Sequence, residues 1–449
     1  MKNTTTRRGF IKQVAATGVG LTIGGMSFKA SSAKSYANIM GSNERVNMAV
    51  MGTNGRGAGM ARNFQSRKDV EMRYVCDVEE KALAKGVAAV KKAGGNPKTE
   101  KDIRKVLADK NIDAILVTAP DHWHAPATIM ACQAGKHVYC EKPCSHNPHE
   151  GELSLAAARK YNRVVQVGAQ RRSWPGLTEG IEALHNGVIG KVHFAKAWYT
   201  NNRKSIGFGK EMPAPSTIDF DLWQGPAPRR SYRDNLIHYN WHWFWHWGTG
   251  EALNNGTHMV DLLRWGMDLD FPTAVTSTGG RYYYKDDWEA PDTQVINLDF
   301  GGKKSMMWEG HCCNPFRIEG EVVGLLFYGE KANLLIGGGN EYKILDHKNQ
   351  VIKHVTSKIQ IDPRNKMNPA QQLDALHIQN FFDGITKGTL LHADILSGHK
   401  STLLVQLGNI AQRSSERLLV DPSDGHIRNK EAAGKYWART YEKGWEMKL

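Results

Sequence analysis

The segment Val46–Gly57 constrains the fold of this 449-residue chain more than any other stretch. The apolar run VNMAVM leads directly into the glycine turn GTNGRG, and a second apolar run, MRYVCD, ends on Asp77. Asp77 follows Gly57 by about 20 residues, the spacing of a dinucleotide-binding βαβ unit. Gly52 permits the tight turn, Gly57 lets the next helix pack close to the strand, and the helix N-terminus offers N–H groups to a pyrophosphate. The segment therefore predicts a nucleotide site in which Asp77 holds the adenosine ribose.

This motif departs from the G-x-G-x-x-G fingerprint at one position. Asn54 stands where the second glycine lets the backbone approach the phosphate closely. Asparagine adopts left-handed backbone conformations more readily than other non-glycine residues. Taken alone, the motif is also compatible with a glycine turn in an ordinary α/β core. The choice between a nucleotide site and an ordinary turn therefore depends on motifs elsewhere in the chain.

Length and charge set two further limits. With 449 residues and 41% hydrophobic content, the chain is too long for one ordinary domain, and we expect two. The net charge is +14, and residues 1–33 contribute five basic residues and no acidic one. The aromatic residues cluster with histidine and glycine rather than with arginine and lysine, so we expect no nucleic-acid partner.

The N-terminal segment resembles a twin-arginine export signal. TRRGFIK, Thr6 to Lys12, is followed by the weakly apolar stretch QVAATGVGLTIGGMSF and then by small residues from Ala30 to Ala33. The apolar part is shorter than the roughly 20 residues that a membrane span requires, and glycine and threonine interrupt it. We therefore expect residues 1–37 to hold the signal and the start of a linker, with export of the folded protein to the periplasm and no membrane span.

The six cysteines predict neither a metal site nor a firm disulfide. Cys76 and Cys140 end apolar strand-like runs, as small buried side chains do. Cys140 and Cys144 lack a second cysteine pair at zinc spacing, and the neighbouring Cys312 and Cys313 cannot form an ordinary unstrained bridge.

Strand and helix patterns alternate from residue 46 to about residue 169. The strand-like runs are apolar throughout rather than alternating, which is typical of parallel strands covered on both faces. We expect helices at residues 58–66, 79–93, 102–108, 124–134 and 151–161. Ligands of doubly wound sheets bind beyond the carboxyl ends of the strands. Two such ends carry reactive side chains, because AILVTAP runs into DHWH at residues 121–124 and HVYC runs into EKP at residues 141–143.

These motifs together resemble the Gfo/Idh/MocA family, named for glucose-fructose oxidoreductase and inositol dehydrogenase. The glycine turn, Asp77, TAPDHWH, EKP and VGAQRR at residues 167–172 occur in that family's order and spacing. The resemblance implies an α/β protein with an NAD-binding Rossmann domain, a doubly wound parallel sheet, at residues 44–168. It implies a substrate-binding α/β domain with a large, open, mostly antiparallel sheet at residues 169–449. Strand-like runs at residues 191–200, 274–284, 293–300, 304–311, 322–329 and 332–338, and two helices within residues 376–413, fit that second domain.

The resemblance also implies which residues form the site. In the family, the lysine of EKP lies between nicotinamide and substrate, which assigns Lys142 here. ALNNGTHMVDLLRW matches the family's D-x-x-x-H element, with Asn254 at the usual aspartate and His258 at the histidine. The residues expected to hold NAD are Gly52, Asn54, Gly55, Arg56, Gly57, Asp77, Ala119, Pro120, His124, Glu141, Lys142 and Gln170. The residues expected to bind substrate are Arg171, His242, Trp243, Asn254 and His258.

Lys142 and His258 are the expected catalytic residues. Hydride transfer from a secondary alcohol needs a base for the hydroxyl proton and a positive or donating group for the developing alkoxide. Burial and a neighbouring cation are expected to lower the pKa of Lys142. An aspartate at position 254 would raise the pKa of His258, whereas Asn254 adds no charge. We therefore expect His258 to be a mostly neutral base at neutral pH and Lys142 to carry more of the charge stabilisation.

The aromatic stretch WHWFWHWG at residues 241–248 allows two interpretations. Tryptophan and histidine faces stack on the C–H faces of sugar rings, so the stretch could form a carbohydrate-binding rim with Arg171, with direct contacts from His242 and Trp243. Alternatively, it is an aromatic hinge between domains or an oligomer contact.

The sequence favours an exported NAD-dependent oxidoreductase that oxidises a ring hydroxyl of a sugar or glycoside, an activity that includes glycoside 3-dehydrogenation. The alternative is an NAD-dependent glycosidase of the family 109 type, which acts by oxidation and elimination and resembles the chain at Thr257 and His258. That family's tyrosine shortly before this pair is replaced by Asn254-Asn255-Gly256. A tightly held cofactor would be reoxidised in place, by a second sugar or by an electron acceptor. The sequence leaves homo-oligomer formation open.

Overall fold

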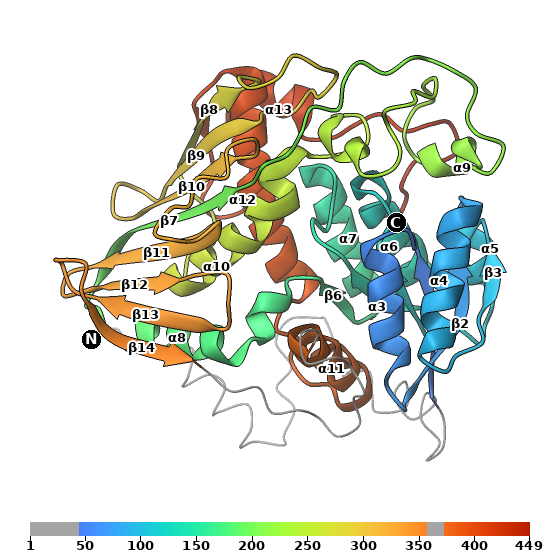
Figure 1. Cartoon of the computed structure of the whole chain (residues 1–449), viewed down its shortest axis with the longest axis horizontal. Helices are drawn as coiled ribbons and strands as arrows, with labels where there is room; N and C mark the ends of the chain where they lie inside the picture. The colour runs from blue at the N-terminus through green and yellow to red at the C-terminus, as the bar shows by residue number, and fades with distance from the viewer. Residues whose placement is uncertain (1–44, 357–371) are drawn as a thin grey trace, which may run out of the picture. The chain divides into compact units, whose positions relative to one another are not determined.

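The structure, a computed structural model, describes residues 45–356 and 372–449 of the chain. Two β-sheets organise this part of the chain, and each has its own helices (Figure 1). The expected signal at residues 1–37 lies outside the described residues. Within the described ranges, no helix has both the length and the apolar character needed to cross a bilayer.

The first sheet is six-stranded and parallel, in the order β3-β2-β1-β4-β5-β6. This is the order of the doubly wound dinucleotide-binding fold, as the alternating pattern predicts. β1 and β4 are almost wholly buried, which explains their continuous apolar runs. β3 was not predicted, because its three polar residues form no apolar run. The strands are β1 (Val46–Met51), β2 (Val70–Cys76), β3 (Lys98–Glu100), β4 (Ala114–Val117), β5 (His137–Cys140) and β6 (Val165–Val167).

Five helices connect these strands in the predicted order. They are α3 (Arg56–Gln65), α4 (Glu80–Lys92), α5 (Ile103–Ala108), α6 (Asp121–Gln133) and α7 (Pro148–Lys160). Side chains cap three of them, because Glu79, Asp102 and Asn147 accept hydrogen bonds from backbone N–H groups of the first turn. α6 and α7 each begin three residues earlier than predicted. In α7 the reason is visible in the sequence, since Asn147 caps the helix and Pro148 occupies its first position.

A helix from the far end of the chain completes the first domain. α11 (Gln372–Lys387) lies beside α3 (Figure 1), and its residues Ile378, Phe381 and Phe382 share a core with β1, β2, β4 and Tyr139 of β5. α3 and α4 cover only part of that sheet face, so α11 buries the remainder. The expected division at residues 168 and 169 stays a prediction, and residues of α11 share the core of the first sheet.

The second sheet is nine-stranded, in the order β14-β13-β12-β11-β7-β10-β9-β8-β15. Every neighbouring pair is antiparallel except β7 with β10, so the predicted mostly antiparallel sheet is confirmed. The strands are β7 (Val192–Thr200), β8 (Ala274–Gly280), β9 (Thr293–Asp299), β10 (Ser305–His311), β11 (Val323–Gly329), β12 (Asn333–Ile336), β13 (Glu341–Leu345), β14 (Val351–Thr356) and β15 (Leu418–Leu419).

Two features of this sheet differ from the prediction. β8 ends at Gly280 instead of continuing to Tyr284, because Asp292 Oδ2 accepts hydrogen bonds from the N–H groups of Tyr282 and Tyr283 and draws them into a loop. The strands β13, β14 and β15 were not predicted. They are short, and β14 is a largely exposed edge strand without an alternating pattern.

Three helices pack against this sheet and form the largest core with it: α8 (Pro175–His185), α10 (Thr257–Met267) and α12 (Ile395–Ser414). A π-helical turn, Ala252–Gly256, leads into α10, so Asn254 and His258 lie on two joined elements rather than on one regular helix. Shorter helical elements are η1 (Gln170–Ser173), α9 (Phe220–Gln224), η2 (Asn240–Trp243) and α13 (Lys430–Tyr436). All six cysteines are buried and free.

Candidate active site

A cavity of about 610 Å³ lies beyond the carboxyl ends of β1, β4 and β5, and the π-helical turn and α10 of the second domain form part of its wall. Its size is within the range of small-molecule and cofactor sites. The structure brings sixteen of the seventeen predicted site residues to this cavity, the exception being Trp243. They are Gly52, Asn54, Gly55, Arg56, Gly57, Asp77, Ala119, Pro120, His124, Glu141, Lys142, Gln170, Arg171, His242, Asn254 and His258.

The glycine turn has the geometry that a phosphate cradle requires. Gly52 has φ of +86°, and a Cβ there would lie 2.6 Å from the backbone nitrogen of Ala119. A Cβ on Gly57 would lie 1.8 Å from the carbonyl oxygen of Gly52, so only glycine allows this contact between helix and strand. A Cβ on Gly55, by contrast, would meet no atom within 4 Å. The turn is therefore open beside the N-terminus of α3, where a pyrophosphate would bind.

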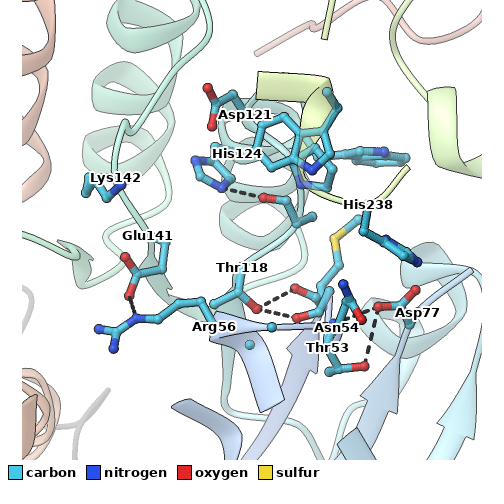
Figure 2. A pocket seen from close by; sticks show the side chains of 18 of the residues that line it. Thr53, Asn54, Arg56, Asp77, Thr118, Asp121, His124, Glu141, Lys142 and His238 are labelled. Atoms are coloured by element: carbon cyan, nitrogen blue, oxygen red, sulfur yellow. Dashed lines mark hydrogen bonds and ion pairs between the residues drawn. The ribbon is translucent and has the colours of Figure 1, made fainter. Parts of the chain in front are cut away.

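Asp77 is fixed at the end of β2 by backbone donors. Its Oδ2 accepts from the N–H of Thr53 at 2.6 Å, and its Oδ1 accepts from the N–H of Glu79 at 3.0 Å. Burial raises the pKa of Asp77, and these two hydrogen bonds oppose that effect. Figure 2 shows the carboxylate facing the cavity near His238. The arrangement fits a dinucleotide whose ribose hydroxyls bond Asp77.

A network of charges joins the glycine turn to the segment after β5 that carries Lys142. Glu141 Oε1 accepts from Arg56 Nε at 3.2 Å (Figure 2) and from Gln170 Nε2 at 2.9 Å. Arg56 also donates twice to the carboxylate of Asp374, at 2.9 and 3.0 Å. Asp374 at the start of α11 was not predicted, because nothing in its local sequence marks it as a partner of Arg56.

Lys142 contacts the second domain directly. Its Nζ donates to the carbonyl oxygen of Asn254 at 2.5 Å and to Asn254 Oδ1 at 3.3 Å. Burial lowers the pKa of Lys142 below its usual value, although the carboxylates of Glu141, Asp121 and Glu251 oppose the change. The direction agrees with the expectation, and burial is the main cause.

His258 lies on the same cavity, on the first turn of α10. Its Nδ1 is buried and has no hydrogen-bond partner among residues 45–356 and 372–449. Burial lowers the pKa of His258 well below its usual value, and the charges of Lys142 and Arg171 lower it further. A neutral imidazole that lines a cavity can accept a proton from a bound hydroxyl.

Three other predicted residues occupy defined places. Arg171 is stacked over the Trp174 ring at 4.8 Å, and burial lowers its pKa to about 10. His242 is stacked on Trp241 at 3.6 Å between ring centroids, and burial lowers the pKa of His242 to about 3. His124 lies with Nδ1 2.6 Å from the carbonyl oxygen of Pro143 and Nε2 2.7 Å from that of Ala119. It therefore ties two strand ends together, in addition to lining the cavity.

The structure corrects the expected substrate contact of Trp243. Its indole is 2% exposed, stacks on Trp288 at 3.9 Å and does not line the cavity. The 3-10 helix η2 turns Trp241 and His242 toward the cavity and Trp243 toward a separate core. Most of the aromatic stretch is therefore packing, and Trp241 together with Tyr239 supplies the aromatic wall that was predicted for Trp243.

Residues 217–247, here termed the covering segment, bring second-domain side chains over the nucleotide end of the cavity. Leu222, Trp223 and His238 line the cavity with the glycine turn and Asp77. The segment is bonded to the first domain at both ends. The carbonyl of Thr217 accepts a hydrogen bond from the N–H of Glu80. The carbonyl of Trp223 accepts one from the Trp123 indole, and the carbonyl of Trp247 accepts one from the N–H of His122. His238 Nε2 also lies 3.2 Å from Glu79 Oε2.

Comparison with known proteins gives a consistent result for both domains. The Gfo/Idh/MocA model described as an oxidoreductase family with an NAD-binding Rossmann fold matches residues 46–169. The model for the C-terminal alpha/beta domain of the same oxidoreductase family matches residues 190–279. Residues 46–169 are therefore an NAD-binding Rossmann domain, and the cavity residues described above fit that cofactor.

Three curated relatives share part of this sequence. Myo-inositol 2-dehydrogenase of Thermotoga maritima is 30% identical over 38% of this chain and 47% of its own length. A glycosyl hydrolase family 109 protein of Saccharopolyspora erythraea is 27% identical over 46% of this chain and 48% of its own. D-glucoside 3-dehydrogenase of Escherichia coli is 30% identical over 30% of this chain and 37% of its own. The chain thus spans about half or less of the length of these relatives.

A solved structure extends the likeness in fold to most of the chain. Levoglucosan dehydrogenase in complex with NADH and levoglucosan superposes with a TM-score of 0.64 at 16% identity, covering 84% of this chain and 99% of that one. Two consecutive domain matches to one family, on the two domains that the structure shows, place this chain in the Gfo/Idh/MocA oxidoreductase family.

Proposed function

We propose that this protein is an NAD-dependent oxidoreductase that oxidises a ring hydroxyl of a sugar or glycoside. The observation that carries the proposal is the meeting of Lys142 and His258, from different domains, in the cavity that also contains the glycine turn and Asp77. Bound NAD+ supplies the hydride acceptor. Only a cavity shared by both domains can hold a nicotinamide and an alcohol within reach of both side chains.

The two side chains divide the work on the substrate oxygen. The His258 imidazole, which lines the cavity, takes the hydroxyl proton. The Lys142 ammonium donates to the same oxygen and stabilises the negative charge that develops as the carbonyl forms. Asn254 holds Lys142 Nζ through two oxygen atoms and so fixes its position.

A sugar fits the rest of the cavity wall. Tyr239 and Trp241 offer aromatic faces, while Arg171, His242 and Asn255 offer polar atoms for hydroxyl groups. The named relatives act on polyhydroxylated rings, which supports the same substrate class here. Because one of these relatives is a glucoside 3-dehydrogenase, a 3-keto glycoside is the first product to look for.

A family 109 type glycosidase is the second candidate, and one contact favours it. Such an enzyme oxidises a ring hydroxyl, eliminates the aglycone, adds water to the resulting double bond and then reduces the ketone again, which requires an additional acid or base. The tyrosine expected close before His258 is absent from the sequence, but the Tyr239 hydroxyl lies 3.4 Å from Asn254 Nδ2 and lines the cavity. A tyrosine from the covering segment therefore occupies the neighbourhood of Lys142.

Product analysis separates the two candidates. Purified protein is incubated with nitrophenyl glucosides and galactosides, and keto-sugar and free nitrophenol are both quantified. A dehydrogenase accumulates the keto-glycoside with the phenol still attached. Release of phenol without net oxidation of the sugar would instead establish the glycosidase. If neither keto-sugar nor phenol were formed, both candidates would be refuted.

The pH dependence should reflect the two lowered pKa values. His258 must be neutral to accept a proton, and its pKa lies well below the usual 6.5, so activity should persist on the acidic side of neutrality. Lys142 must be charged, and its pKa lies below the usual 10.5, so activity should fall as the pH rises through that lowered value. We expect a plateau of kcat/KM across neutral pH. An acidic limb at pH 6.5 or above would contradict the assignment of His258.

We also propose that the protein is exported by the twin-arginine route with NAD already bound, and that the cofactor is reoxidised in place. The signal-like residues Thr6 to Lys12 support export, because this route carries folded proteins. The covering segment supports tight binding, since the nucleotide would be enclosed by both domains. A second sugar or an electron acceptor would then close the catalytic cycle.

The protein should therefore purify with NAD(H) that survives gel filtration. Denaturation should release NAD(H) and not NADP(H), because the Asp77 carboxylate repels a 2′-phosphate. His238→Ala removes the contact with Glu79 and part of the cavity wall, so this variant should lose cofactor faster on dilution. His354→Ala, which breaks a similar His–Glu contact on β14, is the matched control and should retain it. Release of NADP(H), or equal retention by both variants, would overturn this account.

A further inference from the structure

Glu251 is a buried carboxylate just behind the cavity wall. Its side chain is 1% exposed, and it does not line the cavity. Arg203 pairs with it through Nε to Oε2 and through a second nitrogen to Oε1 at 3.2 Å. The guanidinium of Arg203 in turn lies over the rings of Tyr239 and Trp243, at 5.2 and 4.8 Å. A charge pair enclosed in this way holds its geometry firmly.

The same carboxylate determines how the Asn254 amide is turned. Glu251 Oε1 accepts from Asn254 Nδ2 at 3.3 Å and also from Asn255 Nδ2. An ionised carboxylate can only accept hydrogen bonds, so the amide NH₂ of Asn254 must face Glu251. The amide oxygen is thereby directed to the other side, where it accepts from Lys142 Nζ at 3.3 Å.

We propose that Glu251 is a positioning residue for Lys142: its carboxylate orients the Asn254 amide and supplies the negative charge that the asparagine at position 254 lacks. The inference rests on the proposed function, in which a charged Lys142 stabilises the substrate oxygen. It explains why asparagine, rather than aspartate, occupies position 254. An aspartate there would place an oxygen about 3.3 Å from Glu251, where two carboxylates repel each other.

Glu251 acts on Lys142 alongside several other charges. Glu141, Asp121 and Glu251 raise the pKa of Lys142, whereas burial and Arg56 lower it. Two imidazoles, those of His242 and His258, also face Lys142. Glu141 is paired with Arg56, and Asp121 accepts a hydrogen bond from Thr249 Oγ1. Loss of the Glu251 charge should therefore move the Lys142 pKa to a lower value.

The test is Glu251→Gln, read by a method that does not require turnover. The pH dependence of trace acetylation by acetic anhydride, followed at Lys142 by peptide mass spectrometry, reports when the amine loses its proton. Exposed Lys105 serves as the internal reference. In the variant, labelling of Lys142 should rise at a lower pH than in the wild type, and the basic limb of kcat should move in the same direction. We expect kcat to fall by up to about 10²-fold with a smaller change in KM.

Glu150→Gln is the matched control. Glu150 is also a fully buried carboxylate paired with an arginine, Arg439 at 2.7 Å, but it lies outside the cavity. It should leave the Lys142 profile unchanged. An unchanged profile in folded Glu251→Gln, or an equal shift in Glu150→Gln, would overturn the inference. Because labelling needs no substrate, failure of the proposed function would appear separately, as absence of glycoside oxidation by the wild type.

A charge exchange between positions 251 and 254 is a second test of the positioning role. Asn254→Asp alone should lose activity and stability because it places two carboxylates together. The double variant Glu251→Gln/Asn254→Asp should recover both, since a glutamine amide can donate to the new aspartate. A double variant no better than Asn254→Asp would refute the positioning role.

Discussion

Lys142→Met is expected to reduce turnover by about 10³-fold or more while leaving the cofactor bound. The change removes the one donor that stabilises the developing alkoxide, and loss of a single such donor costs on the order of 10²- to 10³-fold in kcat. Removal of the positive charge from a buried site adds to that loss. NAD should remain because the glycine turn, Asp77 and the covering segment hold the nucleotide. The measurements are kcat on a glycoside that the wild type oxidises and the nicotinamide content after gel filtration.

Lys136→Met is the matched control for this variant. Lys136 is a buried lysine, but it lies before β5 rather than after it, and its Nζ donates to the carbonyl of Asp109 at 2.8 Å. It should keep full turnover. A Lys142→Met protein that oxidises glycosides at a nearly normal rate would remove Lys142 from the mechanism.

His258→Ala is expected to slow kcat by about 10²- to 10⁴-fold, the usual range for loss of a general base. Added imidazole should restore part of the rate, because the substitution leaves a cavity where the side chain stood. His399→Ala on α12 is the control. His399 is likewise buried, its Nδ1 also lacks a partner in the described ranges, and its pKa is lowered to about 4, yet it lies away from the cavity. Unaltered rates in His258→Ala would show that another group takes the proton.

The first domain could be predicted almost completely because its signals are local. Continuous apolar runs, glycine turns and caps each act within a few residues, and they gave the strands β1, β2 and β4 to β6 in correct order. The contribution of α11 could not be predicted, because its helical pattern does not reveal which of the two sheets it will cover. Only the folded chain shows Phe381 and Phe382 against Phe64, more than 300 positions earlier in the sequence.

The site residues that lie in sequence motifs were predicted, whereas those whose role depends on long-range contacts were missed. Lys142, His258 and Asn254 lie in recognisable patterns, and the structure brings them together. Glu251 is three residues from Asn254, but its importance depends on Arg203, and that pairing has no sequence signature. In the aromatic stretch, composition alone could not distinguish a cavity-facing side chain from a packed one. The distinction between Trp241 and Trp243 depends on Trp288, which is distant in the sequence.

The most direct test of the central claim is a single turnover by the protein as isolated. It is mixed with an excess of nitrophenyl glucoside or galactoside, without added NAD+, and the near-ultraviolet absorbance of reduced nicotinamide is followed. Our account predicts that the bound cofactor becomes reduced in proportion to the protein, and that an equal amount of glycoside loses two hydrogen atoms. Cofactor that shows no net reduction while phenol is released, or that becomes reduced only when free NAD+ is supplied, would contradict it.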